Sequence, residues 1–163
     1  MTPAPLLRVA RPEDAAAIAA LTREAYGKWV DVIGREPLPM QVDYAETLGR
    51  HRFDLLVIDD ALVGLIETVT DGEFLLIENL AVRPLWQKRG YGGELLRWAE
   101  SFASQAGLRG LRLYTNQRFV ENICFYQWFG FAIEREAPHG GGVIVYMKKM
   151  LAQAPPRDAR HMP

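Results

Sequence analysis

A turn that contains several glycines is the segment of this sequence best suited to bind an anion. Gln87, Gly90 and Gly92 have the spacing Q-x-x-G-x-G between a predicted strand and a predicted helix, and Lys88 and Arg89 add two cations. The first N–H groups of a helix have no partner within the helix, and glycine lets an anion approach the backbone. The turn is predicted to hold a pyrophosphate, although an ordinary tight turn has the same residue types.

Other phosphate motifs and metal sites fit the sequence poorly. A dinucleotide fingerprint needs Gly or Ala at Leu95 and an acidic residue about 20 residues later, where the chain has residues 108–112, which are not acidic. No G-x-x-x-x-G-K-[ST] occurs, which excludes P-loop chemistry. Cys124 is the only cysteine, and no metal site is expected because the histidines lack ligand spacing: His51, His139 and His161.

The composition is that of a globular protein. The chain has 163 residues, of which 49% are hydrophobic and 24% charged. A net charge of -1 provides no cationic field for nucleic acid or an anionic membrane. No apolar run approaches the ~20 residues of a membrane-spanning helix, and the N-terminus has no signal-peptide core. We therefore expect a cytoplasmic protein without nucleic-acid or membrane partners.

The periodicity of apolar residues predicts the elements that position the turn. A first helix begins at Pro12 and weakens near Gly34. The other predicted helices cover 42–50, 91–106 and 119–129, and strands cover 6–10, 53–58, 61–70, 74–82, 110–115, 131–137 and 143–149. Two strands joined by a helix are normally parallel, so 74–82 and 110–115 should form a parallel pair. We expect one domain over 1–151 and a disordered tail over 152–163.

Two motifs in this order resemble the GNAT superfamily of N-acetyltransferases. Residues 87–92 fit its motif [QR]-x-x-G-x-[GA], and Tyr126 to Phe131 fits its Y-x-x-x-G-F segment. The run from Ile33 to Tyr44 is similar to one in bacterial members. The resemblance implies an α+β fold with a mostly antiparallel sheet of about seven strands, a central splayed parallel pair and about four helices. It also implies that acetyl-CoA donates an acetyl group to an amine.

The resemblance further implies which residues bind acetyl-CoA. Backbone N–H groups near Leu80, Ala81 and Val82 would meet the acetyl carbonyl and the pantetheine arm. The pyrophosphate would lie on the turn formed by Gln87, Lys88, Arg89, Gly90, Tyr91, Gly92 and Gly93. The family often has Asn where this chain has Phe119. Asn116 and Asn122 are alternatives to that residue for holding the arm, beside Phe125.

Catalytic roles follow from the same resemblance. Tyr126 occupies the position of the general acid, and its pKa of about 10 is close enough to the ~8.5 of a thiol for proton transfer. The acceptor ammonium needs a base, for which Glu78 is the first candidate and Glu67 the second. The polar pair Glu78-Asn79 interrupts an apolar strand, so a bulge there could splay the parallel pair. Tyr126 would otherwise be a core aromatic, and Glu78 a solvent-facing residue.

The acceptor would border the loop between the first two helices. Tyr26, Trp29, Arg35 and Tyr44 are the candidate substrate-binding residues there, although a proline-pinned loop would use the same types. A homodimer is compatible with the family. The alternative to an enzyme is an acyl-CoA-binding sensor that does not turn over. A hydrolase is a third, disfavoured reading, because Ser101 and Ser104 lie in a predicted helix without a G-x-S-x-G turn and Cys124 lacks a placed base.

Overall fold

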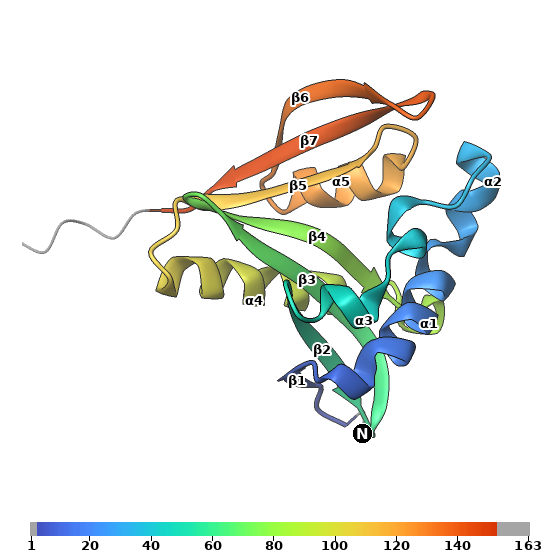
Figure 1. The fold of residues 1–163 in the computed structure, drawn as a ribbon. Coiled ribbons are helices and arrows are strands. Elements are labelled where there is room, and N and C mark those ends of the chain that lie inside the picture. The colour runs from blue at the N-terminus through green and yellow to red at the C-terminus, as the bar shows by residue number, and fades with distance from the viewer. Residues whose placement is uncertain (1–2, 153–163) are drawn as a thin grey trace, which may run out of the picture.

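The structure, a computed structural model, describes residues 3–152. They contain a seven-stranded sheet with the order β1-β2-β3-β4-β5-β7-β6 (Figure 1). The strands are β1 (Leu6–Val9), β2 (Arg52–Ile58), β3 (Ala61–Asp71), β4 (Phe74–Val82), β5 (Gly110–Asn116), β6 (Ala132–His139) and β7 (Gly142–Met150). The helices are α1 (Ala15–Tyr26), α2 (Val30–Ile33), α3 (Tyr44–Thr47), α4 (Tyr91–Gln105) and α5 (Val120–Trp128), with 3-10 turns at Pro12–Asp14, Gly27–Trp29, Leu38–Gln41 and Pro84–Trp86.

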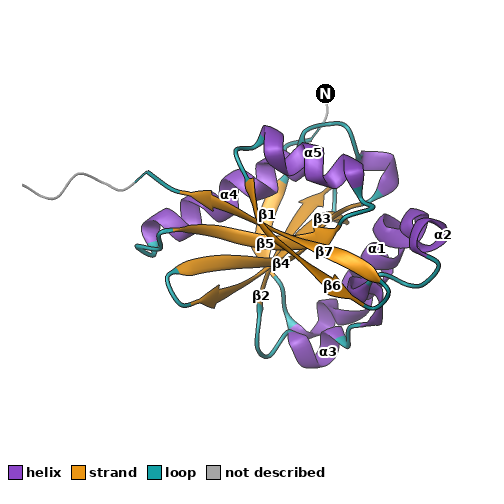
Figure 2. Cartoon of the chain, turned by 90° about the horizontal axis from the view of Figure 1, so that it is seen from above, coloured by secondary structure: helices purple, strands orange, loops and turns teal. Residues whose placement is uncertain are grey.

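Helices cover both faces of the sheet (Figure 2). Successive side chains of a strand point to opposite faces, so neighbours in β2 enter different clusters. Leu55 packs in the cluster that contains Leu21 of α1, whereas Leu56 packs in the cluster that contains Leu95 of α4. All four side chains are at most 1% exposed. Two apolar layers therefore fix α1 and α4 against opposite faces of the central strands.

The sheet opens between its only parallel pair in the described residues, β4 and β5. Their pairing runs from Phe74 opposite Gly110 to Ile77 opposite Leu113 and goes no further. Beyond it, β4 continues beside β3 as far as Val82, and β5 continues beside β7 (Figure 1). The predicted parallel pair and its splay are confirmed.

A bulge in β4 lies where the splay begins. In the register between β3 and β4, Thr68 faces Ile77 and Glu67 faces Asn79, which leaves Glu78 as an extra residue. An extra residue in one strand bends that strand and interrupts its ladder. The bulge predicted at Glu78-Asn79 is therefore confirmed.

Most elements match the predicted order, and the differences have local causes. The helix expected over 42–50 is only α3, because the chain turns again at Leu48 and Gly49, while Asp43 caps its start by accepting from the N–H of Glu46 (3.3 Å). The last hairpin is tighter than expected, since Gly140 and Gly141 alone form its turn with φ values of 54° and 81°. Two-residue hairpin turns favour such values. Apart from Ala152, the predicted tail lies outside the described residues.

Candidate active site

The glycine turn joins the end of β4 to the start of α4. Gly90 stands at the helix N-cap with φ 89°, and Lys88 has φ 61°. The side-chain amide of Gln87 donates to the carbonyl of Val82 (2.9 Å), which ties the turn to the strand. The first N–H groups of α4 are thus held at the mouth of a groove with no side chain on Gly90 or Gly92 to cover them.

We call this hollow the glycine groove; it is bounded by residues 80–82, the turn and one side of α5. Most of the predicted cofactor residues line it: Leu80, Ala81, Val82, Gln87, Lys88, Gly90, Tyr91, Gly92, Gly93, Asn122 and Phe125. Arg89 does not line it and instead stacks its guanidinium over Trp86, 5.1 Å from the ring centroid. Trp86 itself lines the groove and is a residue that the sequence motif does not include.

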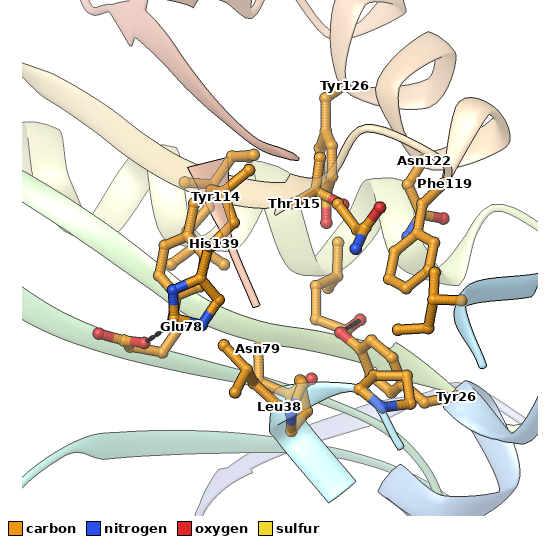
Figure 3. Close-up of a pocket in the computed structure, with 18 of the residues that line it drawn as sticks. Tyr26, Leu38, Glu78, Asn79, Tyr114, Thr115, Phe119, Asn122, Tyr126 and His139 are labelled. Carbon is orange, nitrogen blue, oxygen red and sulfur yellow. Dashed lines mark hydrogen bonds between the residues drawn. The ribbon is translucent and has the colours of Figure 1, made fainter. Parts of the chain in front are cut away.

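A second hollow, the central cavity, lies where β4 and β5 diverge (Figure 3). It has a volume of about 660 Å³ including its open mouth, and the loop between α2 and α3 forms one wall. Four residues line both it and the glycine groove: Tyr26, Leu80, Asn122 and Tyr126. The two hollows therefore meet beside Tyr126, and a ligand can occupy both.

Tyr126 is buried where the two hollows meet. It is 8% exposed and packs edge-on against Phe131, and burial raises the pKa of its phenol. Its hydroxyl therefore stays protonated through the neutral range. Tyr26 lies across the junction, where its hydroxyl donates to the carbonyl of Leu80 (3.4 Å) and burial raises its pKa as well.

Glu78, the extra residue in the bulge of β4, lines the central cavity. The phenol of Tyr114 on β5 donates a hydrogen bond to it (Figure 3). Burial, followed by this contact, raises the pKa of Tyr114, so its proton stays in the bond. Tyr114 is a site residue that we did not predict from the sequence. The parallel register of β4 and β5 is the feature from which the contact could have been predicted. Ile77 and Leu113 are the last paired residues, and Glu78 and Tyr114 directly follow them.

The second predicted carboxylate, Glu67, belongs to a different hollow. We call this the side cavity; α3 forms part of its lining, and it shares five residues with the central cavity: Leu38, Pro39, Glu78, Asn79 and Tyr114. Glu67 is 4% exposed and pairs with the Nδ1 of His51 (2.7 Å). Burial raises the pKa of Glu67, and the contact with His51 opposes that rise. Glu67 lines the side cavity and is not among the residues of the central one.

The four predicted acceptor residues are divided among the hollows. Tyr26 and Arg35 line the central cavity. Trp29 lines the glycine groove instead, where it stacks on Phe119 with ring centroids 4.4 Å apart. Tyr44 lines the side cavity, and its hydroxyl donates to the carbonyl of Pro39 (2.6 Å).

The two asparagines proposed as alternatives both line the central cavity. Asn122 also reaches the glycine groove, whereas Asn116 does not. The side-chain oxygen of Asn116 accepts from the backbone N–H of Arg118 (2.9 Å). Phe119 contributes an apolar, 5% exposed ring to the cavity wall, where the family often has Asn.

Residues 3–152 provide neither a cluster of metal ligands nor a membrane-spanning helix. They contain no group of three or more His, Cys, Asp and Glu side chains arranged to hold a metal ion. None of the helices in that range combines the length and the hydropathy of a membrane span.

The chain shares its fold with solved acetyltransferase structures. The ribosomal-protein-S18-alanine N-acetyltransferase of Escherichia coli superposes with a TM-score of 0.76 and 17% identity, covering 94% of this chain and 98% of that one. The PaiA N-acetyltransferase of Thermoplasma acidophilum, in complex with coenzyme A, gives 0.73 and 21%, covering 91% and 99%. A GNAT-family protein of Desulfovibrio desulfuricans gives 0.77 and 19%, covering 91% and 100%. No curated protein matches the chain.

The family model of the acetyltransferase (GNAT) domain matches residues 51–133, half of the chain. That stretch contains the glycine turn, the bulge at Glu78 and the helix that carries Tyr126. The fold that the chain shares with these solved structures agrees with the match. This chain belongs to the GNAT family of acetyltransferases.

Proposed function

We propose that this protein is an acetyl-CoA-dependent N-acetyltransferase that moves an acetyl group to a primary amine by direct attack. The observation that carries the proposal is the position of Tyr126, a buried phenol at the junction of the glycine groove and the central cavity. Glu78 also lines the central cavity. A proton donor and a proton acceptor therefore line one cavity, which adjoins the groove proposed for the cofactor.

The chemistry of the glycine groove suits coenzyme A. The free N–H groups at the start of α4 and the ammonium of Lys88 suit a pyrophosphate. The unpaired edge of residues 80–82 suits the amides of a pantetheine arm, because β4 has lost its β5 partner there. Acetyl-CoA would supply an acetyl group activated as a thioester.

Glu78 is our preferred base. The acceptor is mostly an ammonium ion at neutral pH and must lose a proton before its nitrogen can attack. Glu78 lines the central cavity, whereas Glu67 is confined to the side cavity and pairs with His51. As the new C–N bond forms and the C–S bond breaks, Tyr126 would give its proton to the departing thiolate. Tyr114 would act as a positioning residue through its hydrogen bond to Glu78.

The alternative is an acyl-CoA sensor without turnover on the same fold. A sensor has no need of a cavity that holds both a buried phenol and a carboxylate next to the cofactor groove, so these residues favour the enzyme. The cytoplasmic location, the single domain and the homodimer stay predictions.

Two measurements test the proposal. Calorimetry measures the binding of acetyl-CoA, and the release of free thiol measures turnover with each amine of a panel. We expect binding and turnover by the wild type, and a fall in kcat of about 100-fold for Glu78→Gln with acetyl-CoA binding retained. Glu67→Gln is the matched control and should change kcat by less than about 10-fold. Binding without turnover of any amine would favour the sensor. Equal losses in the two variants would contradict the choice of Glu78.

A further inference from the structure

Arg35, one of the predicted acceptor residues, is a charged residue of the central cavity that takes no part in the proposed proton transfers. It follows the left-handed Gly34 that ends α2 and lies in the loop that walls the cavity. The side chain is half-buried, and its guanidinium makes no hydrogen bond or ion pair with any residue in 3–152. A guanidinium without a partner in a partly dehydrated cavity favours an anion there, because it presents a fork of donors that water satisfies incompletely.

The turn between β6 and β7 leaves room for this guanidinium. A Cβ on Gly140 would lie 3.2 Å from a terminal nitrogen of Arg35 and 3.4 Å from its Cζ, so the glycine turn and the arginine are in close contact. Arg35 therefore lies between the α2–α3 loop that carries it and the β6–β7 hairpin. A smaller hollow lined by Arg35, Asn116, Arg118 and the hairpin glycines continues outward from it.

Other groups near Arg35 are also donors. Asn116 lines both the central cavity and the smaller hollow, and its side-chain nitrogen donates to no residue in the described range. His139 lines the central cavity as well. The carboxylate of Glu78 is the one acidic group in the cavity lining, and Tyr114 already donates to it. Glu78 also borders the side cavity, whereas Arg35 and Asn116 also border the smaller hollow, so the acidic residue and these two donor residues adjoin different neighbouring hollows.

Coenzyme A does not account for Arg35. The cationic side chain of Lys88 and the start of α4 border the glycine groove, whose lining does not include Arg35. A phosphate held at the turn is therefore outside the hollows that Arg35 lines.

We infer that the acceptor is a small amine that also carries an anionic group, and that Arg35 binds that group while the ammonium faces Glu78. A carboxylate fits the planar fork of a guanidinium in a bidentate manner, and so does a phosphate. The matching acceptor class is thus an amino acid or another amino carboxylate, or an amino phosphate of similar size. The inference rests on the proposed function and adds its substrate class.

Matched pairs of acceptors test this assignment: glycine against glycinamide, β-alanine against β-alaninamide, and O-phosphoethanolamine against ethanolamine. The wild type, Arg35→Gln and Arg35→Lys are compared by thiol release with saturating acetyl-CoA. We expect Arg35→Gln to raise KM for anionic acceptors about 10- to 100-fold, the size of a lost charged hydrogen bond, and to leave KM for their neutral partners within about 2-fold. Arg35→Lys should recover part of the loss. The ratio of variant to wild type for each acceptor cancels the different pKa values of the amines.

Arg109→Gln is the control variant, because Arg109 pairs with Glu73 at the surface and lines none of the hollows described above. Thermal unfolding shows whether Arg35→Gln still folds.

If that variant raises KM equally for neutral and anionic acceptors, Arg35 only supports the hairpin and the inference fails. Preference of the wild type for neutral or cationic amines also overturns it, but leaves the proposed function intact. Failure of acetyl-CoA to bind, or of every amine to react, contradicts the proposed function itself. Comparison of the amino carboxylates, glycine and β-alanine, with O-phosphoethanolamine identifies which anionic group is recognised.

Discussion

Tyrosine has two different environments in this site. Tyr126 is surrounded by aromatic rings, and burial is the cause that raises its pKa. Tyr114 instead has its proton committed to the Glu78 carboxylate. Two identical side chains therefore differ in whether the proton is available to a third group. This difference makes Tyr126 the proton donor of the proposal and Tyr114 the residue that orients the base.

Tyr126→Phe should lower kcat by about 100-fold, because general acids contribute at least that much in typical enzymes. The ring would still fill its place beside Phe131, so the dissociation constant of acetyl-CoA should stay within about 2-fold. Steady-state kinetics and calorimetry measure the two quantities. Tyr146→Phe is the control: Tyr146 on β7 lies next to Tyr114, with its ring tilted against it, and is not among the residues that line the central cavity. If Tyr126→Phe keeps the kcat of the wild type, Tyr126 is not the general acid.

At the scale of elements, local patterns and the parallel pair of strands could be predicted from the sequence, whereas side-chain contacts between separate elements could not. The glycine turn, its helix and the bulge at Glu78 depend on residues next to one another in the chain, and the structure agrees with all three. The contact of Tyr114 with Glu78 depends on where two parallel strands stop pairing. The pair of His51 with Glu67 and the contact of Arg35 with the Gly140 turn join separate elements, so spacing in the sequence contains no signal for them.

The packing of α4 against α5 requires glycine within the turn motif, independently of any ligand. A Cβ on Gly93 would lie 2.6 Å from the Cζ of Phe129, which is closer than a real contact. We expect Gly93→Ala to destabilise the protein by about 1–3 kcal/mol, the usual cost of overpacking. Urea unfolding in the absence of acetyl-CoA measures this change in the free energy of unfolding.

Gly27→Ala is the matched control for this prediction. Gly27 has helical dihedrals, and a Cβ there would meet nothing within 4 Å. Replacing such a glycine should stabilise by about 0.4–1 kcal/mol, because the unfolded chain loses freedom. If both variants shift stability in the same direction by similar amounts, the contact with Phe129 is not what makes Gly93 necessary.

The junction of β1 with α1 should give a stability that depends on pH. Arg8 binds the Asp14 carboxylate through two nitrogens (2.8 and 2.9 Å), and the N–H of Arg11 donates to it as well. The hydrogen bond from Arg8 is the main cause that lowers the pKa of Asp14 to about 2. A depressed carboxyl pKa stabilises the folded state fully above the unfolded value of ~3.9, and this stabilisation is lost as pH falls through about 2.

Asp14→Asn should therefore lower the free energy of unfolding by about 1 kcal/mol at pH 7, after allowance for screening by solvent. The difference in the free energy of unfolding between this variant and the wild type should decrease steadily below pH 4. Urea titrations from pH 7 to pH 2.5 follow it. Asp31→Asn, at an exposed residue of α2, should change stability by less than about 0.5 kcal/mol at every pH. A difference that is constant with pH would show that the ion pair contributes nothing.

At the scale of the whole molecule, the one sheet has two arms that diverge between β4 and β5. Strands β1 to β4 carry α1 and α3 on one face, while β5 to β7 form the other arm of the V in Figure 1. Four residue pairs between β4 and β5 join the arms within the sheet, and α4 packs across both strands. A cofactor whose arm enters the splay would connect the two halves where the sheet does not.

Acetyl-CoA should therefore stabilise the protein both globally and at particular amides. A ligand at about 100 times its dissociation constant adds about 2.7 kcal/mol to the free energy of unfolding, which raises the melting temperature. Hydrogen exchange should slow most at amides of 80–82 and 91–93, because these border the glycine groove and include N–H groups without a partner in a strand or helix. Amides of β1 and β6, which are remote from the groove, serve as the internal reference. Protection spread evenly over all seven strands, with no excess at 80–82 and 91–93, would mean that coenzyme A binds elsewhere on the molecule.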